Sequence, residues 1–166
     1  MKTVKPTSKT TLTGAAGEYF VLYKLLRRGL LAGLPPAGAP DVDVLVIDDN
    51  ANVLISLQVK TRRKGADKGW HMKEKHEDLV SPRLFYVFVD MEPDDPVCYV
   101  IPSAVVAECV AKENRAWLAI PGKKGQPHNP HSMRRLLPKY PYPVNGFEDG
   151  WLDEYREQWD QLEGVK

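Results

Sequence analysis

Two strand-like segments decide the fold of this chain: Asp41-Val42-Asp43-Val44-Leu45-Val46-Ile47 and Val53-Leu54-Ile55-Ser56-Leu57-Gln58-Val59-Lys60. Both are rich in β-branched and aliphatic residues, and the Asp/Asn-rich turn 48–52 between them predicts a β-hairpin. Because side chains alternate between the two faces of a strand, Gln58 and Lys60 must point to the same side. Asp41 and Asp43 also share a face, so alternation does not decide which of them belongs with that pair.

Signals for further elements surround the hairpin. A helix is expected from about Thr13, its N-cap, to Arg28, with a broad apolar stripe between them. Glu18 lies on this helix beside the small residues 14–17, which allow close approach to another element. The other predicted elements are a buried central strand, a second strand, a helix capped by Ser103 and a short edge strand: 83–89, 97–101, 102–114 and 117–120.

The polar residues of the hairpin suit one kind of chemistry. Asp43, Gln58 and Lys60 supply a carboxylate, an amide oxygen and an ammonium group on adjacent strands, and Glu18 offers a second carboxylate. Cleavage of a phosphodiester bond requires a divalent ion that neutralises developing charge and activates an attacking water. Oxygen ligands suit Mg²⁺ or Mn²⁺, and a nearby lysine can orient the water or stabilise the transition state.

On these residues the chain resembles the PD-(D/E)XK superfamily of nucleases. The likeness covers roughly residues 10–105 and rests on Gly17-Glu18, Pro40-Asp41-Val42-Asp43 and Gln58-Val59-Lys60-Thr61. The Gln-x-Lys variant resembles methylation-dependent restriction enzymes and Holliday-junction-resolvase-like proteins. The resemblance implies an α/β, restriction-endonuclease-like fold with a mixed four- to five-stranded sheet flanked by helices. It also implies a metal-dependent endonuclease acting on DNA. The implied ligands of Mg²⁺ or Mn²⁺ are Asp43, Gln58, the Val59 backbone carbonyl and Glu18.

Three readings of this site stay open at the level of sequence. The literal Pro-Asp pair assigns the ligand role to Asp41, whereas Asp43 leads directly into the hydrophobic strand, so we favour Asp43 and keep Asp41 as the alternative. Gln58 is a poorer ligand for a hard ion than a carboxylate. An inactive nuclease-fold module that binds nucleic acid or a protein partner is therefore the second reading. An unrelated α/β domain with Asp43 and Lys60 far apart is the third.

The net charge of +1 hides an uneven distribution. Residues 148–166 hold seven acidic and two basic side chains, which leaves 21 basic and 15 acidic residues, or about +6, on residues 1–147. A phosphate-facing surface explains this pattern, and so does an ordinary solvated face. The residues expected to contact nucleic acid are basic and lie in the stretch 61–76 and the segment 121–147: Arg62, Arg63, Lys64, Lys123, Lys124, Arg134 and Arg135.

Aromatic and histidine side chains accompany these basic clusters. His128 and His131 suggest a surface loop that can contact phosphates, more than a metal pair, because no third ligand is near. Trp70 and His71 lie in the basic stretch, which is expected to be mobile. They can stack on bases, although packing of Trp70 under a loop is the favoured interpretation.

Length and composition set the outer limits. With 166 residues, the chain is expected to form a single domain: a core at about 10–120, an irregular basic segment at 121–147 and an acidic amphipathic helix at 148–166. Its two cysteines are too few for a disulfide framework and are expected to be buried and reduced. No apolar run suits a signal peptide or a membrane span, so a cytoplasmic location without membrane contact is expected. A homodimer is expected because two active sites cut two strands most easily.

Overall fold

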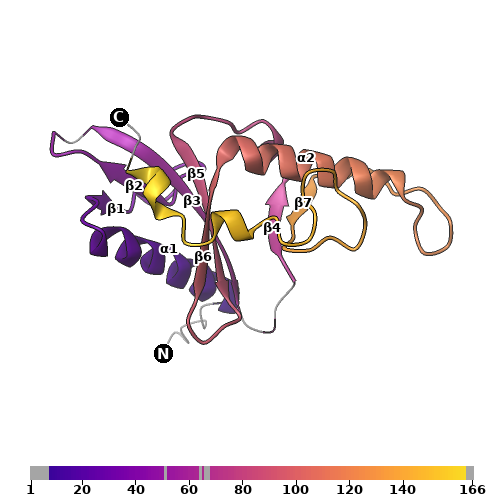
Figure 1. Ribbon diagram of the computed structural model, residues 1–166, viewed down its shortest axis with the longest axis horizontal. Helices are drawn as coiled ribbons and strands as arrows, with labels where there is room; N and C mark the ends of the chain where they lie inside the picture. The colour runs from indigo at the N-terminus through magenta and orange to yellow at the C-terminus, as the bar shows by residue number, and fades with distance from the viewer. Residues whose placement is uncertain (1–7, 51, 64, 66–67, 164–166) are drawn as a thin grey trace, which may run out of the picture.

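Five strands form the central sheet: β1 (Ala32–Gly33), β2 (Val44–Ile47), β3 (Val53–Arg63), β5 (Leu84–Met91) and β6 (Val97–Pro102). The computed structural model describes residues 8–50, 52–63, 65 and 68–163 (Figure 1). The strands lie in the order β1-β2-β3-β5-β6, and all neighbours are antiparallel except β3 and β5. The prediction of a mixed four- to five-stranded sheet is therefore confirmed.

The β2–β3 hairpin is closed by its aspartate-rich turn. The Asp48 carboxylate accepts hydrogen bonds from the backbone N–H groups of Asn50 and Asn52, each at 2.9 Å. In the hairpin Val44 pairs with Leu57, so the 11-residue β3 continues well past the first residue of the four-residue β2. Beyond this point β3 pairs only with β5, which leaves a corner where β2 begins.

Helix α1 (Lys9–Arg27) covers one face of the sheet. Its N-cap lies five residues earlier than predicted, because Ser8 and not Thr13 caps the helix: the Ser8 hydroxyl accepts a hydrogen bond from the Thr11 N–H. Val21 and Leu25 pack into an aliphatic core with residues of all the longer strands. The helix comes very close to β3 at Gly17, which faces Thr61.

Helix α2 (Ser103–Ala119) covers the opposite face, where its apolar side packs on the aromatic residues of β5. The edge strand predicted for 117–120 is wrong, since residues 117–119 complete the helix and Ile120 is its C-cap. Ser103 does not cap the helix; its hydroxyl accepts from the Ser81 N–H and donates to the Ser81 carbonyl. Among the described residues, no helix combines the length and apolar character needed to cross a membrane. Both cysteines are free and buried, as predicted.

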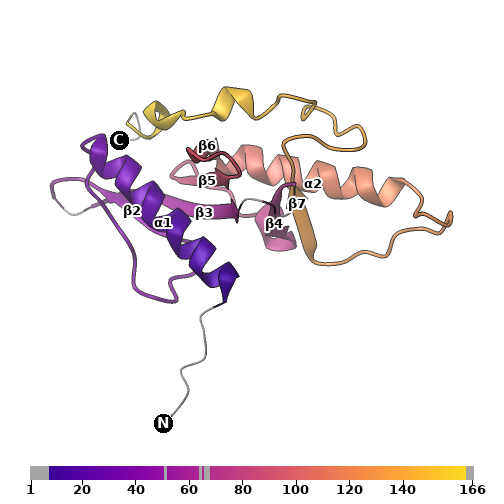
Figure 2. The same ribbon diagram turned by 90° about the horizontal axis from the view of Figure 1, so that it is seen from below.

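A second, two-stranded sheet pairs β4 (Trp70–Lys73) with β7 (Met133–Leu136) in antiparallel register. The short 3₁₀ helix η1 (Glu74–Glu77) follows β4 directly. Figures 1 and 2 show this small sheet beside α2, on the side of the main sheet opposite to α1. The expectation of a mobile stretch at 61–76 is thus corrected, because β4 and η1 lie within it. The segment 121–147 is irregular as predicted, except for the four residues of β7 that pair with β4.

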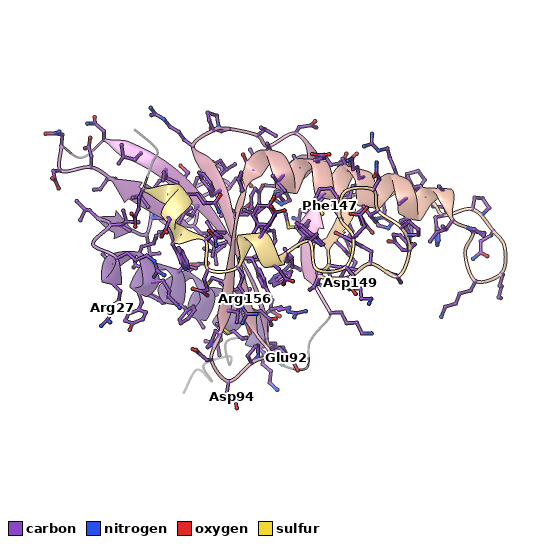
Figure 3. All side chains as sticks on the ribbon, viewed as in Figure 1. Arg27, Glu92, Asp94, Phe147, Asp149 and Arg156 are labelled. Carbon is purple, nitrogen blue, oxygen red and sulfur yellow. The ribbon has the colours of Figure 1, made fainter. Side chains whose placement is uncertain are left out.

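The C-terminal segment forms two 3₁₀ turns, η2 (Asp153–Tyr155) and η3 (Trp159–Leu162), and the prediction of one amphipathic helix over 148–166 is wrong. The backbone pairs with β6 through Arg156 and Tyr99, and the Glu157 N–H donates to the Cys98 carbonyl. Figure 3 labels Arg156, which lies over the sheet. A left-handed φ of 53° at Glu157 breaks any helix there. The apolar residues of the segment are nevertheless buried, as their spacing predicts: Trp151, Leu152, Trp159 and Leu162.

Candidate functional site

Asp43 lies at the corner where β2 begins. Its backbone N–H donates to the Leu57 carbonyl at 2.8 Å, and its carboxylate accepts the backbone N–H of Val59 at 2.7 Å. These two hydrogen bonds continue the hairpin by one more residue and fix the carboxylate against the middle of β3. Asp43 is thereby held next to the Gln58-Val59-Lys60 segment.

Gln58 projects from β3 at this corner, and the residue is 5% exposed. The amide oxygen Oε1 has no hydrogen-bond partner among the residues that the structure describes. A buried polar atom without a partner costs about 1–3 kcal/mol, so proteins seldom keep one without a use. A buried, desolvated oxygen without a partner is the kind of group that a cation can satisfy.

Glu18 approaches the corner from α1. Burial raises the pKa of its carboxyl group, and the negative charge of Asp43 raises it further. The two carboxylates are therefore near enough to repel each other, although they come from different elements. The close contact of Gly17 with Thr61 explains this position, because it brings the next residue of the helix down to β3.

Lys60 is half-buried on the same face of β3 as Gln58, as alternation predicts. Burial lowers the pKa of its ammonium group, the charge of Asp43 opposes this change, and Lys75 adds to it. Lys60 thus interacts with Asp43 across the corner. The reading of an unrelated domain, which requires these two side chains to be remote, finds no support in this arrangement.

Asp41 faces a different partner. Its carboxylate forms an ion pair with Lys75, and the hydrogen bond from Lys75 holds the pKa of Asp41 below its ordinary value. The residue adopts a left-handed φ of 57°, which turns the chain just before β2. Asp43, and not Asp41, forms the hydrogen bonds to Leu57 and Val59 and interacts with Glu18. These contacts favour Asp43 over Asp41 as the candidate metal ligand.

A pocket of about 320 Å³ opens beside this corner. Gln58 and Lys60 form its inner wall, and residues of β4, η1 and the start of β7 form the rest: His71, Met72, Lys73, Lys75, His76, Ser132 and Met133. His76 is buried and its Nδ1 lies 2.9 Å from the Tyr86 hydroxyl. Burial lowers the pKa of His76 to about 4, and Lys60 and Lys75 add to the effect. His76 is therefore neutral at pH 7.

The basic run around Lys73 and Lys75 is visible in the sequence, but nothing there assigns it to the site. The signal that could have found it is the alternation in β4, where Trp70 and Met72 are buried and His71 and Lys73 are exposed. That pattern predicts a strand, but its partner lies some sixty residues away in β7. Only the fold shows that this strand borders the hairpin.

The basic residues expected to contact nucleic acid fall into separate groups. The Arg62 guanidinium pairs with Asp90 and lies over the Trp70 ring, and the Arg134 guanidinium is buried against Glu77. Both are committed to internal contacts, which leaves them poorly placed to receive a phosphate. The others divide by exposure: Arg63, Lys123 and Lys124 are exposed, Arg135 is half-buried, and Lys64 lies outside the described residues.

The aromatic candidates are also accounted for by packing. Trp70 is 2% exposed and its indole N–H donates to the Val89 carbonyl at 3.1 Å, so it packs under the connection and is not exposed for base stacking. His128 stacks on Trp117 with ring centroids 3.9 Å apart, and His131 lies 4.9 Å from the same ring. The loop interpretation of the two histidines agrees with this arrangement.

The mixed sheet between two helices, with an acidic corner where β2 begins, is a nuclease-like α/β fold. Among solved structures, the chain is similar to the bacterial homing endonuclease I-Ssp6803I, with a TM-score of 0.55 over 96% of this chain and 95% of that one. The two sequences are 16% identical, so the likeness is one of fold. No protein-family model matches the sequence, and no curated protein matches it.

Proposed function

We propose that this protein is a metal-dependent endonuclease of the PD-(D/E)XK type that hydrolyses phosphodiester bonds of DNA. The observation that carries the proposal is the meeting of Asp43, Gln58 and Lys60 at one corner, approached by Glu18. The fold likeness to a homing endonuclease supports it. The inactive-module alternative has no specific observation in its favour.

The residues that would hold Mg²⁺ or Mn²⁺ are Asp43, Gln58, Glu18 and the backbone carbonyl of Val59. The described residues contain no cluster of three or more His, Cys, Asp and Glu side chains placed for a metal. The donor set fits nevertheless, because an unpartnered amide oxygen complements two carboxylates that repel each other. Oxygen donors of this kind suit hard divalent ions. When bound, such an ion acidifies a water and neutralises charge on the phosphate.

The side chains of the corner have separable tasks in hydrolysis. The reaction joins a water oxygen to phosphorus and breaks a bond to a bridging oxygen, which leaves with a proton. Lys60 is placed to orient the attacking water and to stabilise the charge that grows on the phosphate oxygens. A lowered pKa suits the first task, since it brings the amine closer to proton exchange near neutral pH. Asp43, held by the Val59 N–H, anchors the reacting groups.

The proposal is tested by incubating supercoiled plasmid DNA with the protein and Mg²⁺ or Mn²⁺, with EDTA as the control. Nicked or linear product is expected when the protein is incubated with Mg²⁺ or Mn²⁺, and not when EDTA is present. Lys60→Met should reduce the rate by about 10²–10⁴-fold, the usual contribution of a positioned acid–base group. Glu18→Gln should also slow cleavage, while circular dichroism confirms that both variants fold.

Two results would overturn the proposal: no cleavage of any DNA form by the folded wild-type protein, or cleavage that Lys60→Met leaves unchanged. Cleavage of RNA but not of DNA would also overturn it, because the proposal names DNA as the substrate. We also expect a homodimer, which analytical ultracentrifugation of the same preparation measures directly.

A further inference from the structure

Positive charge gathers around the pocket beside the catalytic corner. Lys60 projects into it from β3, Lys73 from β4 and Lys75 from η1, three elements that the fold brings together. Lys73 and Lys75 both act electrostatically on Lys60 and on His76, so the charges share one region. Since His76 is neutral, the positive charge of this pocket comes from its lysines.

The lysines are incompletely matched by negative charge. Lys75 pairs with Asp41, and Lys60 is attracted by Asp43 and Asp41 without forming a salt bridge to either. Lys73 forms no salt bridge within the described part of the chain. Like charges held close together raise the energy of the folded protein unless an anion lies among them. The pocket volume of about 320 Å³ lies at the lower end of the roughly 300–1,000 Å³ typical of ligand sites. An anionic group is therefore the ligand that the pocket suits.

We propose that this pocket is a phosphate subsite that binds the backbone phosphate next to the scissile one. The inference rests on the proposed nuclease function, because Gln58 and Lys60 belong to both the corner and the pocket wall. A strand whose scissile phosphate lies at the corner must place its neighbouring phosphate close by. Lys73 and Lys75 are positioned to receive it.

Asp41 has a defined role in this arrangement. In the free protein its carboxylate is the partner of Lys75. A phosphate entering the pocket competes with Asp41 for the Lys75 ammonium group, so Asp41 weakens phosphate binding while it keeps Lys75 in place. Removing the Asp41 charge should therefore tighten binding, whereas removing either Lys73 or Lys75 should weaken it.

The experiment measures binding of a fluorescent DNA duplex by anisotropy in EDTA, at several salt concentrations, so that no cleavage occurs. Each phosphate contact contributes roughly 0.9 to the slope of log affinity against log salt concentration, which is called the salt slope. Losing one contact therefore costs the double variant Lys73→Ala/Lys75→Ala about eightfold in affinity near 0.1 M salt. The salt slope of this variant should fall by about 0.9 and not by twice that amount, because both lysines contact one phosphate. Asp41→Asn should bind more tightly than the wild type.

A matched ion pair elsewhere provides the controls. Lys139 and Asp149, the latter labelled in Figure 3, also form a salt bridge, but both lie outside this pocket and line another one. Lys139→Ala changes the net charge by the same amount as either single variant, Lys73→Ala or Lys75→Ala, and half as much as the double variant. Asp149→Asn changes it by the same amount as Asp41→Asn. Both controls should leave affinity and salt slope close to wild type.

The proposal is overturned if the double variant binds like the wild type, or if the Lys139 and Asp149 variants shift binding as much as the pocket variants do. The second outcome would identify a general basic surface. Weaker binding by Asp41→Asn would also contradict it. Failure of the nuclease function is a separate result, since it would appear as absent cleavage with Mg²⁺ or Mn²⁺ whatever the binding in EDTA.

Discussion

Gly17 allows the contact that brings α1 onto β3, and its replacement by alanine is expected to weaken the fold. A Cβ at Gly17 would lie 1.7 Å from Thr61 Oγ1, 2.9 Å from its Cβ and 3.0 Å from its Cγ2. Rotation of the Thr61 side chain cannot relieve the contact with its own Cβ, so the helix must move. Overpacking of this kind costs about 1–3 kcal/mol, and a forced shift of backbone lies at the upper end.

The gain in helix propensity opposes this loss. Alanine is favoured over glycine inside a helix by about 1 kcal/mol, so Gly17→Ala should have a net loss of roughly 1–2 kcal/mol in the free energy of unfolding. Gly14 lies in the same helix, and a methyl group added there would meet no atom of another described element within 4 Å. Gly14→Ala should therefore stabilise the protein by up to about 1 kcal/mol.

Urea denaturation followed by circular dichroism measures both variants against the wild type. Because the shift of α1 also moves Glu18, Gly17→Ala should cleave DNA more slowly even at temperatures where it is fully folded, and Gly14→Ala should not. Equal stabilities of the two variants, or a more stable Gly17→Ala, would refute the reasoning from close contact.

Three further predictions concern other parts of the molecule. The pKa of His76 falls from 6.5 to about 4 on folding, so its contribution to stability is complete above pH 6.5 and is lost towards pH 4. Urea denaturation of the wild type and His76→Gln at several pH values measures this loss. Glu157 accepts hydrogen bonds from the Cys98 N–H, the Trp159 indole and Lys24, so Glu157→Ala should lower the free energy of unfolding by about 2–3 kcal/mol in the same assay. Gln58→Leu should keep the fold but abolish metal-dependent cleavage, whereas Gln58→Glu should keep cleavage and raise Mn²⁺ affinity in calorimetry.

The hairpin and the central strands could be predicted from sequence because their signals are local. Alternation of apolar residues and the Asp48 turn determine which side chains of β3 share a face, and Gln58 and Lys60 do share one. The continuous apolar run of β5 also predicts its burial on both faces. These features depend on residues within a few positions of each other.

The parts that sequence reasoning missed depend on distant partners. Residues 133–136 contain no strong strand signal and become β7 because β4 offers a free edge. The spacing of Trp151, Tyr155 and Trp159 is helical, yet the backbone hydrogen-bonds to β6 at Arg156 and Glu157, and this pairing prevents a helix. The ion pair between Asp41 and Lys75, which are 34 positions apart, likewise could not be read from the sequence.

The central claim is that the corner of Asp43, Gln58 and Lys60 catalyses phosphodiester hydrolysis. The most direct test compares single-turnover DNA cleavage by the wild type, Asp43→Asn and Asp41→Asn at saturating protein with Mn²⁺. We expect Asp43→Asn to cleave at least about 10²-fold more slowly, as loss of a charged anchor in a preorganised site requires, and Asp41→Asn to cleave close to the wild-type rate. Cleavage at the wild-type rate by a folded Asp43→Asn protein would contradict the claim.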